Sequence, residues 1–256
     1  MRFVELEEAR QASGLRLVIA TNIPSPWSQA ALGLFDMKGL DYLAVRYRRS
    51  DEEIRHWTGA RNVPAVLFDD EPPRTGWAEI VALGERLGGQ MSLVPDDDER
   101  RVRMFGLSQE ILGEGGLCWN VRLLLTHTGL TTDGRAGWPK PVAEYLGPRY
   151  GYAPDRVPAA RARAVGTLRL LDAVLAESRG RGDGYFLGPS PTALDLHAAV
   201  ALATIRPMPE AECPMLPPVR HAFETLDQEV QEAVSPALLE HRAQMFSRHL
   251  VVPVRS

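Results

Sequence analysis

The sequence predicts an α/β domain over residues 1–92, followed by an all-helical domain over residues 93–256. One observation is a strand, helix and strand pattern near the N-terminus, which is typical of a βαβ unit. Another is a shift to a Pro- and Asp-rich segment at residues 91–98. Beyond that segment, apolar residues recur at helical spacing between Gly- and Pro-rich loops. With 45% of its 256 residues apolar, the chain has enough material for one large or two modest domains.

The βαβ unit is predicted from two short β-rich runs on either side of an amphipathic segment. The run Leu15–Ala20 ends in a turn cluster rich in Pro and Ser, as a buried strand does. Apolar residues recur at helical spacing from Trp27 to Lys38, and Gly39 closes this helix as a C-terminal cap. The second strand is expected at Tyr42–Tyr47.

Four further elements complete the predicted α/β domain. Ser50 begins a short helix that runs to Thr58, and Glu53 lies where a capping box requires an acidic residue. An apolar strand, a proline-limited edge strand and a helix follow, at residues 62–68, 69–74 and 77–87.

The helical domain is predicted from periodicity alone. Gly113–Gly116 has neither the preceding strand nor the following Lys of a phosphate-binding loop, so it marks a helix break or a close backbone approach. Residues 129–158 form a long connection whose aromatic residues favour packing over disorder. The helices are expected at residues 99–128, 158–178, 192–205, 219–232 and 236–249.

Composition and charge argue against several functional classes. The formal charge is −4, from 29 basic and 33 acidic residues that are interspersed, so no nucleic acid partner is expected. No apolar run is long enough to span a bilayer, and residues 1–10 are too acidic for a signal peptide, which predicts a cytoplasmic protein without a membrane role. Cys118 and Cys213 stand alone, and free buried thiols are a simpler interpretation than a disulfide. No Cys or His spacing suggests a metal site.

Three motifs, in order, carry a resemblance to a known family. The first is Ser25-Pro26-Trp27-Ser28, at its distance from Lys38-Gly39-Leu40-Asp41-Tyr42. The second is Asn62-Val63-Pro64, and the third, much later, is Leu187–Asp195 with its Pro-Thr-x-x-Asp pattern. This set resembles the glutathione S-transferase superfamily, and the first motif is similar to those of its omega and zeta classes. The resemblance implies a thioredoxin-like N-terminal domain and an all-helical glutathione S-transferase C-terminal domain, with glutathione as co-substrate.

Ser25 is the candidate catalytic residue that the resemblance implies. Proline at the next position makes Ser25 a favourable helix N-cap, and a helix N-terminus stabilises an anion. The Ser25 hydroxyl would donate to the glutathione thiolate, which is the reactive nucleophile. Alternatively, Ser25 only caps the helix. Ser28 is a second candidate, although a capping partner is the commoner role for a serine there. A serine in place of a cysteine disfavours disulfide reductase chemistry.

The resemblance also implies which residues hold glutathione. Pro26 and Trp27 follow Ser25 directly. A cis peptide bond between Val63 and Pro64 would let the Val63 backbone pair with the cysteinyl part of the tripeptide. The family usually has Glu-Ser or Asp-Ser at the γ-glutamyl end. Here the equivalent segment carries no such pair, and its candidate residues are Arg74, Thr75, Gly76 and Glu79. Alternatively, Thr75 or Gly76 only caps the following helix and Trp77 belongs to the core.

The predicted function is glutathione-dependent transfer to, or isomerisation of, a small apolar electrophile bound by the helical domain. Residues 129–158 form either a wall of that second-substrate site or a packed surface excursion. Thr192 and Asp195 form a structural capping box. A non-catalytic ligand-binding or interaction module with the same fold is the alternative, favoured by the altered γ-glutamyl segment. Family members commonly form homodimers, so a homodimer is expected.

Overall fold

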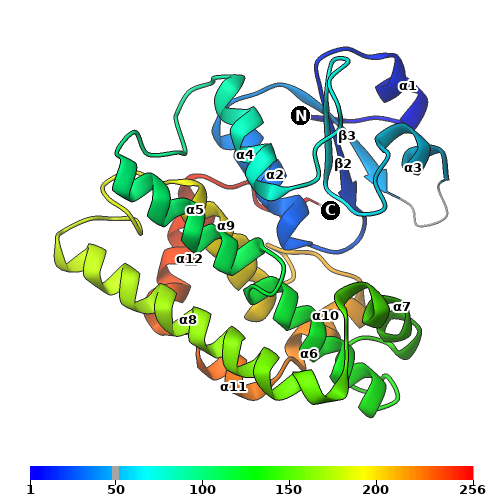
Figure 1. Cartoon of the computed structure of the whole chain (residues 1–256), viewed down its shortest axis with the longest axis vertical. Coiled ribbons are helices and arrows are strands. Elements are labelled where there is room, and N and C mark those ends of the chain that lie inside the picture. Colours follow the sequence, from blue (N-terminus) through cyan, green and yellow to red (C-terminus); the bar gives the residue numbers. More distant parts are fainter. Residues whose placement is uncertain (48–51, 256) are drawn as a thin grey trace.

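Figure 1 shows the computed structural model of the chain, which describes residues 1–47 and 52–255. A small sheet with flanking helices forms the N-terminal part, and every later element of the described chain is helical. The elements are β1 (Arg2–Phe3), α1 (Leu6–Gln11), β2 (Leu15–Ala20), α2 (Pro26–Met37), β3 (Tyr42–Tyr47), α3 (Glu52–Thr58), β4 (Ala65–Phe68), α4 (Trp77–Arg86), α5 (Asp98–Leu112), α6 (Leu117–Thr131), α7 (Lys140–Tyr150), the short 3₁₀ helix η1 (Pro154–Arg156), α8 (Val157–Gly180), α9 (Ala193–Ile205), α10 (Pro217–Glu224), α11 (Gln228–Glu232) and α12 (Pro236–Arg248).

The sheet has the strand order β1-β3-β2-β4. β2 pairs in parallel with β3, with Leu15 opposite Tyr42, and in antiparallel fashion with β4, with Leu15 opposite Phe68. The predicted bounds of β2 and β3 are confirmed. β4 begins at Ala65 instead of the expected position 62, because Pro64 has no N–H to donate to the ladder. The expected edge strand at residues 69–74 is reduced to one bridge between Val66 and Arg74.

Helices cover both faces of the sheet. Leu17 and Ile19 of β2 pack in the large core with α2 and α4, whereas Val18 packs on the opposite face in a smaller cluster with Ile54 of α3. This alternation follows from the two-residue period of a strand. β1 and α1 lie in the polar N-terminal segment, where the sequence predicted no element. The predicted Ser50 helix cap falls outside the described residues.

The predicted helices divide where small or capping residues interrupt them. The expected helix 99–128 is two helices, α5 and α6, separated at Gly113–Gly116 as the glycines indicated. The expected helix 219–232 is also divided, because the Asp227 side chain caps a new helix by accepting a hydrogen bond from the Val230 N–H. Within residues 129–158 the structure has helix α7, which corrects the prediction of an unbroken connection.

The Lys38–Tyr42 motif has a structural role at the end of α2. The buried Lys38 ammonium lies 3.0 Å from Glu85 of α4 and donates to the Met91 carbonyl at 2.9 Å, which ties α2, α4 and the following segment together. Gly39 has a φ of +67°, a conformation that favours glycine at a helix end. Tyr42 donates to the Asp36 carboxylate at 2.9 Å.

Helix α9 joins the two parts of the molecule. All of its residues are buried, and the predicted capping box is confirmed, since Asp195 accepts from the Thr192 N–H at 2.8 Å and from the Thr192 hydroxyl at 2.9 Å. A methyl group on Gly33 of α2 would lie 2.5 Å from Leu196, so α2 and α9 pack at close range. Across residues 1–47 and 52–255, no helix is long and apolar enough to cross a membrane.

Candidate functional site

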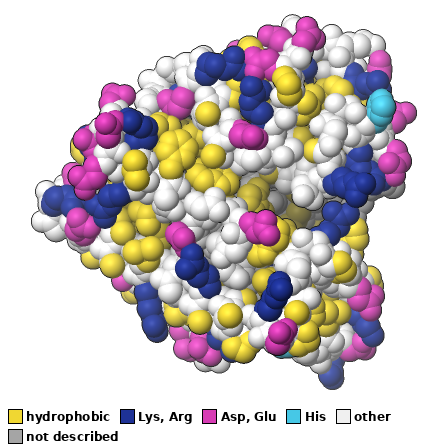
Figure 2. Space-filling model, viewed as in Figure 1, with side chains coloured by type: hydrophobic (Ala, Val, Ile, Leu, Met, Phe, Trp, Pro, Cys, Tyr) yellow, Lys and Arg dark blue, Asp and Glu magenta, His cyan; other side chains and the backbone are white. Residues whose placement is uncertain are grey.

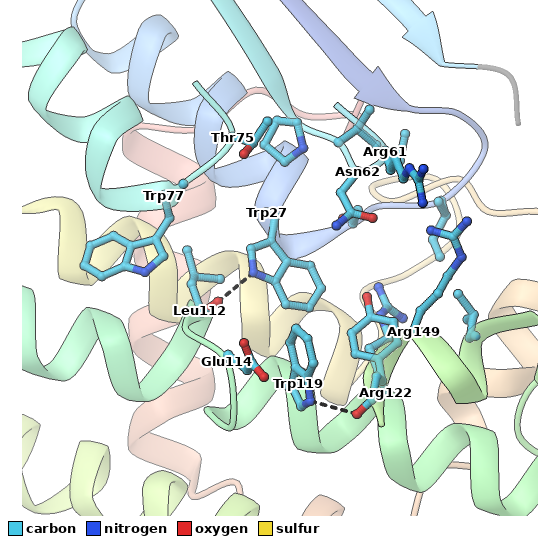
Figure 3. Close-up of a pocket in the computed structure, with 18 of the residues that line it drawn as sticks. Trp27, Arg61, Asn62, Thr75, Trp77, Leu112, Glu114, Trp119, Arg122 and Arg149 are labelled. Carbon is cyan, nitrogen blue, oxygen red and sulfur yellow. Dashed lines mark hydrogen bonds between the residues drawn. The ribbon is translucent and has the colours of Figure 1, made fainter. Parts of the chain in front are cut away.

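A cavity of about 530 Å³ lies between the sheet-bearing part and the helical part. This volume is within the usual range for small-molecule sites. Its walls come from the N-terminus of α2, the segment before β4, the start of α4, the α5–α6 turn and α7. Figure 2 shows this face hollowed between the two parts, with apolar and basic side chains beside the hollow. Figure 3 shows 18 of the residues that line the cavity.

The N-terminus of α2 faces the cavity through Ser25. Ser25 is the N-cap of α2 and is 8% exposed, yet its side chain makes no capping hydrogen bond. By contrast, the N-cap Ser235 of α12 accepts a hydrogen bond from the Leu238 N–H at 3.2 Å. Among the described residues, the Ser25 hydroxyl therefore does not cap α2, and it lies at a helix end whose unpaired N–H groups favour an anion.

Ser28 has different surroundings from Ser25. It is fully buried, and its Oγ accepts a hydrogen bond from the Ala20 N–H at 3.2 Å, at the end of β2. Pro26, the first residue of α2, is also buried. Ser28 thus joins the strand to the helix from behind the cavity wall.

Trp27 connects α2 to the helical part at the cavity surface. Its indole N–H donates to the Leu112 carbonyl, the last residue of α5, at 2.7 Å (Figure 3). This bond satisfies a helix-end carbonyl that has no partner within α5. The ring of Trp27 lines the cavity, 6.5 Å from the ring of Tyr150.

The segment before β4 forms the opposite wall. The Val63–Pro64 peptide bond is cis, and both residues line the cavity. The Val63 backbone N–H and carbonyl make no hydrogen bond to the described chain, so an extended peptide could pair with them. Exposed Arg61 and Asn62 also line this wall, although the sequence prediction did not include them as site residues.

The start of α4 presents two of the four predicted γ-glutamyl residues. Thr75 and Gly76 are exposed and line the cavity. Glu79 instead accepts a hydrogen bond from the Gly76 N–H at 3.3 Å, so part of this anion-binding helix end is already occupied. Arg74 pairs with Glu71 at 2.5 Å. The guanidinium groups of Arg86 and Arg74 hold the pKa of Glu71 below its usual value.

Helix α7 forms part of the cavity wall on the helical side. Tyr145, Leu146, Arg149 and Tyr150 all line the cavity, so part of the 129–158 segment contributes to the pocket. Trp119 of α6 donates from its indole to the Tyr150 carbonyl at 3.2 Å, and the two rings are 4.7 Å apart in an edge-on arrangement. These aromatic rings give the cavity an apolar lining.

Arg122 of α6 is the cavity residue that sequence reasoning missed most completely. It is buried and lines the cavity, together with Arg61, Arg149 and a single acidic residue, Glu114, among the described residues. The available signal was one basic residue within the apolar run Val121–Leu125 of a predicted helix. That pattern predicts a buried charge but not where the charge faces.

Neither cysteine is suited to thiol chemistry in the cavity. Both are free and buried. Burial raises the pKa of Cys118 to about 12 and that of Cys213 to about 11, so both thiols stay protonated near neutral pH. The described residues contain no cluster of potential metal ligands.

Comparisons with known proteins identify the fold. No protein-family model matches the chain, and no curated protein matches it either. A glutathione S-transferase domain-containing protein from Marinobacter aquaeolei VT8 is similar, with a TM-score of 0.63 and 18% identity over 91% of this chain and 98% of that chain. A Methylobacterium radiotolerans glutathione S-transferase in complex with glutathione sulfonate has a TM-score of 0.61 and 17% identity over 92% of each chain. A maleylacetoacetate isomerase from Methylobacterium extorquens AM1 has a TM-score of 0.52 and 19% identity over 89% of this chain and 95% of that chain.

Proposed function

We propose that this chain, which has the glutathione S-transferase fold, binds glutathione in the cavity and uses its thiol to attack a small electrophile. The observation that carries the proposal is the Ser25 hydroxyl, which faces the cavity at the N-terminus of α2 without a capping partner. Structural neighbours support the choice of thiol, since one is a glutathione S-transferase in complex with glutathione sulfonate.

The proposed role of Ser25 is to stabilise a thiolate. Its hydroxyl donates to the glutathione sulfur, and the α2 N-terminus adds a partial positive charge, so the thiol releases its proton to water more readily. The thiolate then forms a bond to an electrophilic carbon. In transfer, a leaving group departs with the bonding electrons. In isomerisation, the adduct rearranges and expels the thiolate again; one structural neighbour is a maleylacetoacetate isomerase with bound glutathione.

The proposed glutathione site follows the N-terminal wall of the cavity. The Val63 backbone, free of partners in the described chain, would pair with the cysteinyl unit. Thr75 and Gly76 would receive the γ-glutamyl end, next to Pro64 and Trp27. Glu79 would act indirectly by holding the Gly76 N–H, and Arg74 by its ion pair with Glu71.

The test is calorimetric titration with reduced glutathione, combined with thiolate absorbance across pH. We expect micromolar to millimolar binding by the wild-type protein. Ser25→Ala should bind with similar affinity, raise the pKa of the bound thiol and lower kcat/KM for a chlorodinitrobenzene probe at least about tenfold, the effect of about 1.4 kcal/mol. Ser247→Ala, at an exposed serine of α12, is the matched control. It should change neither the pKa of the bound thiol nor kcat/KM. An unchanged thiol pKa in Ser25→Ala would exclude this role.

A non-catalytic binding module is the second candidate, and one contact favours it. Because the Gly76 N–H already donates to Glu79, the α4 N-terminus offers fewer free donors to a γ-glutamyl carboxylate. In that case, apolar ligands would bind in the aromatic cavity, whereas glutathione would not bind up to millimolar concentration. Neither the wild-type protein nor Ser25→Ala would then catalyse thiol transfer.

We further propose that the protein acts as a homodimer in the cytoplasm. The dimer follows from the fold resemblance and from the general prevalence of two-fold oligomers. The free thiols of Cys118 and Cys213 fit a reducing compartment. Light scattering coupled to size-exclusion chromatography should give twice the chain mass of 28.3 kDa. A mass of one chain at micromolar concentration would contradict the dimer.

A further inference from the structure

Arg122 is a buried cation without an anionic partner. Its side chain, on α6, is only 5% exposed, and it makes no ion pair with the described residues. Its Nη1 atom is buried and has no hydrogen-bond partner. A guanidinium in such a place retains its charge, and leaving a buried charge unpaired is costly.

The immediate surroundings compensate this charge only in part. The Arg122 guanidinium carbon lies 5.1 Å from the ring centroid of Trp138, 5.4 Å from that of Phe223 and 5.9 Å from that of Trp27. Ring faces attract a cation but do not accept its N–H groups in the way that a carboxylate does. Burial lowers the pKa of Arg122. The electrostatic interaction with Tyr150, the thiol of Cys118 and a side-chain hydrogen bond to Tyr150 oppose this shift, while Nη1 is left without a partner.

Arg122 also lies away from the wall proposed for glutathione. It lines the cavity from α6, in the helical part, whereas Val63, Thr75 and Gly76 line it from the N-terminal part. Figure 3 shows Trp27 between Arg122 and Thr75. A ligand that reaches Arg122 therefore lies near Trp27, whose ring centroid is 5.9 Å from the guanidinium carbon, and near Tyr150.

The charges at the cavity favour an anionic ligand. The exposed residues Arg61 and Arg149 line it as well, and Arg149 stacks over Tyr145 with 4.3 Å between its guanidinium carbon and the ring centroid. Glu114 is the single acidic residue among the described lining. A cleft lined mostly by one sign of charge concentrates ligands of the opposite sign.

We propose that the second substrate carries a carboxylate, which Arg122 binds from the helical side of the cavity, and that its apolar or aromatic remainder lies against Trp27, Trp119 and Tyr150. The substrate class is thus an unsaturated or aromatic carboxylic acid instead of an uncharged apolar electrophile. This inference rests on the proposed function for the identity of the first substrate. The binding of the carboxylate is testable without glutathione.

The experiment compares two probes that differ in charge but hardly in shape, phenylacetate and phenylacetamide. Binding is followed by tryptophan fluorescence, because Trp27 and Trp119 line the cavity. The wild-type protein should bind phenylacetate at least about tenfold more tightly than the amide, a ratio that corresponds to about 1.4 kcal/mol, and added salt should reduce the ratio.

Three variants assign the preference to Arg122. Arg122→Met should bind both probes equally, whereas Arg122→Lys should keep part of the preference, because it retains the charge without the planar donor pair. Arg169→Met, at an exposed arginine of α8, removes the same net charge and should retain the full preference. If Arg122→Met does not fold, the wild-type probe pair and Arg122→Lys decide the question.

The outcomes separate this inference from the proposed function. Equal binding of acid and amide by the wild-type protein overturns the inference, as does a preference that survives in Arg122→Met. An Arg122→Met variant that loses affinity for glutathione as much as for phenylacetate also overturns it, because Arg122 would then serve the first substrate. A preference that depends on Arg122 supports the carboxylate site even where the glutathione titration is negative, and only the transferase proposal then fails.

Discussion

At the scale of single residues, the two hydroxyls of the Ser25–Ser28 motif can be tested separately. The Ser28 Oγ accepts the Ala20 N–H, so Ser28→Ala leaves a partly buried donor without a partner. We expect the free energy of unfolding to fall by about 1 kcal/mol, with no change in the affinity for glutathione or in the pKa of the bound thiol. Urea denaturation and the thiolate titration measure these quantities. A raised pKa of the bound thiol in Ser28→Ala would show that Ser28, and not Ser25, is the catalytic residue.

The sequence predicted the cavity residues that belong to short motifs. Ser25, Trp27, Val63 and Thr75 line the cavity, since each is placed by a turn or helix end within a few residues of itself. Arg122 could not be predicted in the same way. Its burial depends on Trp138 and Phe223, which reach it from distant segments of the chain.

At the scale of elements, the α5–α6 turn depends on a glycine at position 116. A methyl group there would lie 2.7 Å from the Glu110 carbonyl oxygen and 2.8 Å from that of Gln109, both fixed backbone atoms of α5. Gly116→Ala should therefore lower the free energy of unfolding by about 1–3 kcal/mol. It should also weaken ligand binding, because Leu112 and Glu114 line the cavity from this turn.

Gly106 provides the matched control within α5. It is exposed, and a methyl group there would contact nothing within 4 Å, so Gly106→Ala should stabilise the helix by about 0.5–1 kcal/mol. Thermal and urea denaturation of the two variants should move in opposite directions. Equal shifts of the same sign would show that the close approach at Gly116 does not constrain the turn.

Strands β2 and β3 were predicted well, whereas helix α7 was not. β2 and β3 match because their apolar runs end at turn residues. Residues 129–158 were predicted as a long connection, and the structure places α7 within them. Pro141 lies in the first turn, where a missing N–H costs nothing, and Pro148 lies close to the helix end at Gly151, which adopts a φ of 66°. Proline therefore signals a break only in the middle of a helix.

At the scale of the whole molecule, the arrangement of the two parts could not be derived from local patterns. The order of elements predicted an α/β part and a helical part. The contact between them depends on close packing of α2 against α9 at Gly33, and on the bond from Trp27 to the end of α5. The cavity lies at this contact, so its volume and its buried arginine follow from tertiary packing, which no local segment specifies.

His197 makes the stability of this contact dependent on pH. It lies in α9 with 1% exposure, its Nδ1 is 3.0 Å from the Ser108 Oγ of α5, and its ring is 5.5 Å from that of Trp77. Burial lowers its pKa from the usual 6.5 to about 3. Because the folded pKa is depressed, the stability that neutral His197 confers is present above pH 6.5 and is lost as the pH falls toward 3.

Comparison with His197→Gln isolates this effect. Between pH 7.5 and 5.5 the wild-type protein should lose about 1.4 kcal/mol more unfolding free energy than the variant. The reason is that from pH 6.5 to 5.5 the unfolded His197 takes up a proton while the folded one does not. His241, with a pKa lowered by burial to about 4, and Asp195, with one raised by burial to about 6, are present in both proteins and cancel in the difference. Urea denaturation at a series of pH values measures it. Parallel curves for the two proteins would mean that His197 takes up no proton on unfolding in this range, and that the α9 contact is insensitive to acid.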